Sequence, residues 1–74
     1  MKRKWQGVDY STDLKSNNDE GWVALELHKG DSVAGRIVFW DSEGQFSVQI
    51  SADELPLGIV EEFIAEAKSK IKVS

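Results

Sequence analysis

The sequence predicts a single α+β domain over residues 1–74, in which a four-stranded antiparallel meander is followed by one C-terminal helix, in the order β-β-β-β-α. Three observations predict this fold. Apolar and polar side chains alternate through the middle of the chain, a period of two that is typical of half-buried strands. The apolar period becomes helical from Leu57 onward. Short connections separate the strands, which favours antiparallel neighbours.

The first part of the chain predicts one strand and one loop. The strand is predicted over residues 4–10, where Val8 and Tyr10 share one face and Trp5 lies on the other. Residues 11–21 read STDLKSNNDEG, a run of turn-forming residues that predicts a loop. This part of the chain therefore contributes one strand to the predicted sheet.

Three further strands are predicted over residues 22–28, 33–40 and 45–50, because alternate residues in each are apolar. Short turns containing Gly separate them, so consecutive strands are expected to pair. The face predicted to lie under the helix carries Val23, Leu25, Leu27, Ile37, Phe39, Phe46, Val48 and Ile50. The opposite face carries Trp22, Ala24, Glu26, His28, Ala34, Arg36, Val38 and Trp40.

The helix is predicted from Leu57 onward, and Pro56 suits a first helical turn. Glutamates come early in this segment and lysines late, which complements the helix dipole, and Glu66 with Lys70 forms an i,i+4 pair. The late lysines are Lys68, Lys70 and Lys72. The apolar stripe predicted to pack on the sheet consists of Val60, Phe63, Ile64, Ala67 and Ile71.

Composition limits how so small a domain can be stabilised. The chain has no cysteine and one histidine, which excludes disulfides, thiolate metal sites and histidine-rich metal sites. Packing or self-association is the expected support. No apolar run is long enough for a membrane span, and no apolar segment follows the basic start as a secretory signal requires. We therefore expect a cytoplasmic protein.

No enzyme activity is predicted, and neither catalytic residues, metal ligands nor a cofactor are expected. His28 lies at a strand end beside a turn and is interpreted as an ordinary solvated histidine. Asp41 and Glu43 lie in a predicted turn, and Asp53 and Glu54 precede the helix, so turn and cap roles explain these carboxylates. The glycines form no phosphate-binding loop at the start of a helix.

The predicted position of Trp40 is the main indication of function. Because Phe39 and Trp40 are strand neighbours, only one of them can face the core. One register of the hairpin formed by residues 22–28 and 33–40 creates both an ion pair and an aromatic pair on the face away from the helix. The pairs in this register are Glu26 with Arg36, Ala24 with Val38 and Trp22 with Trp40.

An apolar patch on an otherwise solvated sheet face predicts an interface, and tryptophan is enriched at interface hot spots. We therefore predict a non-catalytic interaction module, first of all a homodimer. The alternatives are that the N-terminal segment or loop covers this face, that the tryptophans cap a small core, or that a different protein binds. The predicted interface consists of Trp5, Trp22, Ala24, Glu26, Arg36, Val38 and Trp40.

Two other functions remain as alternatives. A single-stranded nucleic acid could stack on the tryptophans, and its phosphates could contact Lys2, Arg3, Lys4 and Arg36. However, residues 5–67 contain all 13 acidic residues and only three basic ones, which argues against a groove that follows phosphates. The acidic body suggests instead an inhibitor of a basic partner, although ordinary proteins are acidic too.

The run VFWDSEGQF followed by LPLGIVEEFIAEAKSKI resembles the short, uncharacterised bacterial proteins encoded on mobile gene cassettes. The resemblance covers roughly the C-terminal half of the chain. It implies a stand-alone accessory protein of unknown activity and transfers no functional residues.

Overall fold

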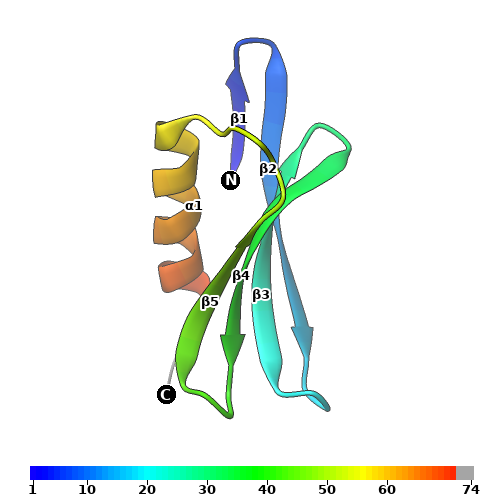
Figure 1. The fold of residues 1–74 in the computed structure, drawn as a ribbon, viewed down its shortest axis with the longest axis vertical. Helices are drawn as coiled ribbons and strands as arrows, with labels where there is room; N and C mark the ends of the chain where they lie inside the picture. Colours follow the sequence, from blue (N-terminus) through cyan, green and yellow to red (C-terminus); the bar gives the residue numbers. More distant parts are fainter. Residues whose placement is uncertain (72–74) are drawn as a thin grey trace.

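The computed structural model describes residues 1–71, which form one antiparallel sheet and one helix (Figure 1). The sheet order follows the chain, so β5 forms one edge, and β1 together with the part of β2 beyond Ser11 forms the other. The predicted α+β class, antiparallel sheet and C-terminal helix are confirmed, but the sheet has five strands rather than four. The elements are β1 (Lys2–Trp5), β2 (Val8–Asn17), β3 (Trp22–Lys29), β4 (Ser32–Trp40), β5 (Gln45–Ile50) and α1 (Leu57–Lys70). Lys72, predicted to serve the helix end, lies outside the described residues.

The additional strand arises because a hairpin replaces the strand and loop predicted for the first 21 residues. Gln6 and Gly7 have φ values of 50° and 80° and connect Trp5 directly to its cross-strand partner Val8. Two-residue hairpin turns of this kind need positive φ at both central positions, where Asn or Asp before Gly is the usual signal. Because Gln occupies the first position, the sequence does not indicate this turn. The many polar residues of β2 are typical of a loop.

The predicted register between β3 and β4 is confirmed, with Trp22 opposite Trp40, Ala24 opposite Val38 and Glu26 opposite Arg36. Toward the other end of this hairpin, a β-bulge shifts the register between Leu27 and His28. One extra β4 residue reverses the facing of the side chains there. Ala34 is consequently buried in the core, although the alternation places it on the opposite face. Val33, which the alternation places on the same face as Ile37 and Phe39, is exposed.

The core lies between α1 and one face of the sheet. The predicted helix stripe is correct at Phe63, Ala67 and Ile71, whereas Val60 is only half-buried and Ile64 is exposed. The helix is rotated so that residues four apart form a narrow buried row. That row is Ile59, Phe63, Ala67 and Ile71. It packs with Tyr10, Leu25, Leu27, Ala34, Ile37 and Phe39 of the sheet.

Polar contacts attach α1 to the β1 side of the sheet. The Met1 amine lies 3.0 Å from Glu66 Oε1, and the Thr12 hydroxyl donates to the same carboxylate. Arg3 forms an ion pair of 2.8 Å with Glu62. These contacts hold the helix over the half of the sheet that contains the N-terminus.

Candidate functional site

The residues predicted as an interface lie on the face of β3 and β4 opposite α1, here called the reverse face, with one exception. Trp5 belongs to the helix side of the sheet, because it pairs with Val8 and shares its face with Arg3 and Tyr10. In a continuous strand Trp5 and Val8 would face opposite ways, whereas the hairpin makes them partners on one face. The expectation that Trp5 joins Trp22 and Trp40 is therefore wrong.

The apolar end of the reverse face is largely covered by its own side chains. Ala24 and Val38 are only 1% and 4% exposed, and the two tryptophans beside them are half-buried. The indole N–H of Trp22 donates to Glu20 Oε2 at 3.0 Å, which holds one ring toward the neighbouring turn. A depression remains between Trp22, Trp40 and Arg36. The tryptophans thus act mainly as a cover over small residues, and residues 11–17 lie in β2 rather than across this face.

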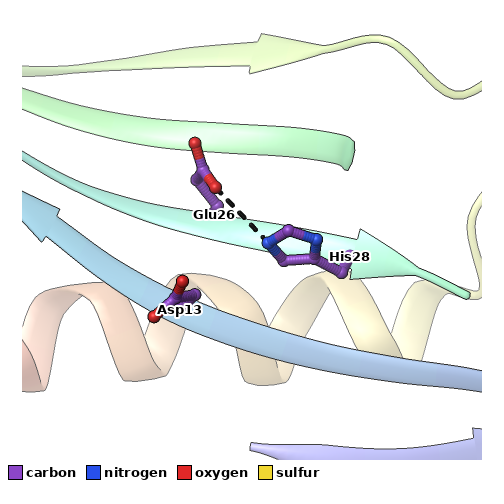
Figure 2. A group of neighbouring side chains, drawn as sticks. All are labelled: Asp13, Glu26 and His28. Carbon is purple, nitrogen blue, oxygen red and sulfur yellow. Dashed lines mark ion pairs between the residues drawn. The ribbon is translucent and has the colours of Figure 1, made fainter. Parts of the chain in front are cut away.

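The centre of the reverse face is polar and contains a cluster formed by Asp13, Glu26 and His28 (Figure 2). His28 Nε2 lies 3.3 Å from Glu26 Oε1, while Arg36 approaches the other oxygen of Glu26, also at 3.3 Å. Asp13 is the cross-strand partner of Glu26. The predicted ion pair of Glu26 with Arg36 is thus formed, and it has two further ionisable neighbours.

Sequence reasoning missed this cluster for two reasons. The sequence around Asp13 predicts a loop, so it does not indicate that Asp13 pairs with Glu26. The position of His28 at a strand end predicts a solvated histidine, but its Nε2 atom exposes less than 1 Å². The available signal was the spacing of Glu26 and His28, which places both on one face of a strand.

A second surface is formed by apolar residues on the helix side of the sheet. Phe46, Val48 and Ile50 of β5 were predicted to lie beneath the helix, yet they are 38%, 59% and 51% exposed. They do face the helix side, because they pair with Phe39, Ile37 and Gly35 of β4. The prediction of their face is therefore correct, and the prediction that α1 buries them is wrong.

The helix adds two exposed apolar side chains to this surface. Glu62 and Glu66 contact the N-terminal side of the sheet, so they mark the helix flank that faces β1. At 100° per residue, Leu57 and Ile64 lie on the opposite flank, toward β5, and both are exposed. We call Phe46, Val48, Ile50, Leu57 and Ile64 the β5-side patch.

The charged group around Glu66 attaches the helix to the sheet and belongs to neither of the two surfaces. Burial opposes ionisation of Glu66, but Lys70, the Met1 amine and Thr12 together lower the pKa of this carboxyl below its ordinary value. The predicted pair of Glu66 with Lys70 is formed at 2.7 Å. This charged group has its partners within the fold, so it is a structural feature rather than a binding site.

Comparisons with protein-family models, curated proteins and solved structures gave no significant match to this chain. Within residues 1–71 no helix combines the length and the apolar character needed to cross a bilayer. We therefore infer the function from the two surfaces of the fold.

Proposed function

We propose that this protein is a small, non-catalytic interaction module that forms a homodimer through the β5-side patch. The observation that carries this proposal is the exposure of Phe46, Val48 and Ile50 on an edge strand. An unpaired edge presents backbone N–H and C=O groups to a new strand, and exposed apolar side chains favour burial by that partner.

A second copy of the chain fits this edge because β5, with the sequence QFSVQI, carries no charge. Antiparallel pairing of two β5 strands centred on Val48 would set Phe46 opposite Ile50 of the other copy, and Ser47 opposite Gln49. Apolar side chains would then meet on the helix side and polar ones on the reverse side. Both helices would lie on the same side of the joined sheet, with their Leu57 flanks facing each other.

The reverse face, which the sequence favoured as the interface, is the weaker candidate. Ala24 and Val38 are already buried, and Trp22 and Trp40 are half-buried. Single-strand binding remains an alternative prediction, but Trp5 and the other tryptophans lie on opposite faces and do not form one stacking platform.

Sedimentation velocity over a dilution series tests the proposal. We expect a concentration-dependent dimer, and we expect Val48→Lys to weaken it at least about tenfold, equivalent to about 1.4 kcal/mol, because an edge lysine opposes strand pairing. Leu14→Lys is the matched control, since Leu14 is an exposed apolar residue on the helix side of β2, outside the patch.

The same measurement on a reverse-face variant distinguishes the β5-side patch from the reverse face as the interface. If Trp40→Ala dissociates the dimer and Val48→Lys does not, the reverse face is the interface and the β5 assignment is wrong. A wild-type protein that stays monomeric at millimolar concentration would overturn self-association altogether.

A further inference from the structure

The cluster on the reverse face brings together three side chains of the types that bind metal ions. Asp13 and Glu26 are paired across β2 and β3, and His28 follows Glu26 on the same face of β3. One ligand atom from each residue lies within 4.8 Å of the other two. Figure 2 shows the three side chains together on the same side of the two strands. Because they come from paired strands, the backbone itself keeps them close.

The histidine nitrogen in this cluster lacks a satisfactory partner. His28 Nε2 is shielded from solvent and makes no hydrogen bond within the described part of the chain. It lies 3.3 Å from Glu26 Oε1, close enough for an ion pair but not aligned for hydrogen bonding. A shielded nitrogen without a hydrogen bond is unfavourable, and a metal ion placed between it and the neighbouring carboxylate oxygen would supply the missing partner.

The spacing suits a metal ion. Two ligands bound tetrahedrally to Zn²⁺ at about 2.0–2.1 Å are separated by about 3.4 Å. The distance from His28 Nε2 to Glu26 Oε1 is 3.3 Å. Asp13 is exposed, so its carboxylate can rotate to complete a third bond without disturbing the core.

Two neighbouring cations affect the site without blocking it. Arg36 contacts Oε2 of Glu26 and leaves Oε1 directed at His28. It can thereby orient Glu26, as hydrogen-bonded neighbours of metal ligands commonly do. Lys15 lies 3.4 Å from Asp13 Oδ2, but both side chains are more than half exposed, so this contact is weak. Their positive charge reduces the affinity of the site for a cation.

We propose that Asp13, Glu26 and His28 bind a divalent transition-metal ion of the Zn²⁺ type, with water completing its coordination. One imidazole nitrogen and two carboxylate oxygens suit Zn²⁺ better than Ca²⁺, which prefers a shell made of oxygen atoms only. This inference is independent of the β5-side patch, because the cluster lies on the other face of the sheet.

Titration of the full chain with Zn²⁺, followed by calorimetry and by NMR of the His28 ring, tests this site. We expect the ring resonances to shift saturably, and His28→Gln and Asp13→Asn each to weaken binding at least about tenfold. Asp9→Asn is the matched control, because it removes the same charge from the same face of β2 outside the cluster. It should leave the affinity unchanged.

Circular dichroism confirms that each variant remains folded before its affinity is compared. Ca²⁺ at the same concentration should not move the His28 resonances. Equal Zn²⁺ binding by wild type and His28→Gln would show adsorption to the acidic surface and overturn the proposal. Unchanged His28 resonances in millimolar Zn²⁺ would overturn it as well.

Discussion

The β1 and β5 edges of the sheet differ in charge and in how far the helix shields their side chains from solvent. β1 is four residues long, reads KRKW, and its Arg3 is tied to the helix through Glu62. β5 is six residues long, reads QFSVQI, and exposes its apolar side chains. Short length and positive charge are the usual protections of an edge strand against pairing with another chain. β1 has both, and the part of β2 that β1 leaves unpaired carries the charges of Asp13 and Lys15. β5 has neither protection, so β5 is the edge at which association is expected.

The position at which α1 is attached decides which side chains of the sheet it shields from solvent. Met1, Arg3 and Thr12 all contact glutamates on one flank of α1. These contacts bring the helix toward β1, and the opposite flank with Ile64 is left exposed. A single helix is narrower than a five-stranded sheet, so its placement decides which apolar residues become core and which become surface.

The largest expected effect separates the buried side of the helix from its exposed flank. Phe63 is 1% exposed, so Phe63→Ala should lower the free energy of unfolding by about 3–5 kcal/mol. Ile64→Ala should lower it by about 1 kcal/mol or less, because that side chain already contacts water. Urea unfolding measures both. Comparable losses for the two variants would mean that the helix is rotated differently from the arrangement described.

A smaller effect tests the attachment of the helix to the β1 side. The pKa of Glu66 is lowered in the folded state, so its carboxylate stabilises the fold above the ordinary value of 4.5. That contribution is lost as the pH falls below 4.5 through the lowered folded value. Glu66→Gln should therefore destabilise the protein by about 1–2 kcal/mol at neutral pH and have little effect in strong acid.

Thermal unfolding from pH 7 to pH 2 measures this difference. Glu62→Gln is the control, since the pair of Glu62 with Arg3 is exposed and should contribute below about 1 kcal/mol. A Glu66→Gln variant that shows the same pH dependence as wild type would exclude Glu66 as the attachment point.

The smallest expected effect on stability comes from making the two edges alike. Replacing both Lys2 and Lys4 by Thr removes two of the charges that protect β1 and should change the unfolding free energy by less than about 0.5 kcal/mol. Without these charges, the β1 edge of one copy should pair with the β5 edge of another, which would build larger head-to-tail assemblies. Light scattering against concentration measures this. Scattering identical to that of wild type would show that charge is not what closes the β1 edge.

Much of the central hairpin could be predicted because its information is local. The alternation of side chains sets the faces of β3 and β4, and one register alone combines the pair of Glu26 and Arg36 with that of Trp22 and Trp40. The candidate metal cluster was harder to foresee, because Asp13 reaches Glu26 only through a pairing of β2 that its polar sequence conceals. The turn at Gln6 and Gly7 lacked the usual residues, so the first hairpin was missed as well.

By itself, the sequence determined the α+β class, the central pairing and the side of the sheet to which each apolar residue of β5 belongs. These properties follow from periods of two and about four residues, which every local segment carries. Only the tertiary structure decided how far the helix reaches across the sheet. It also decided where a bulge places Ala34, rather than Val33, in the core. Both depend on contacts between distant segments, such as Met1 with Glu66, whose energies no local pattern contains.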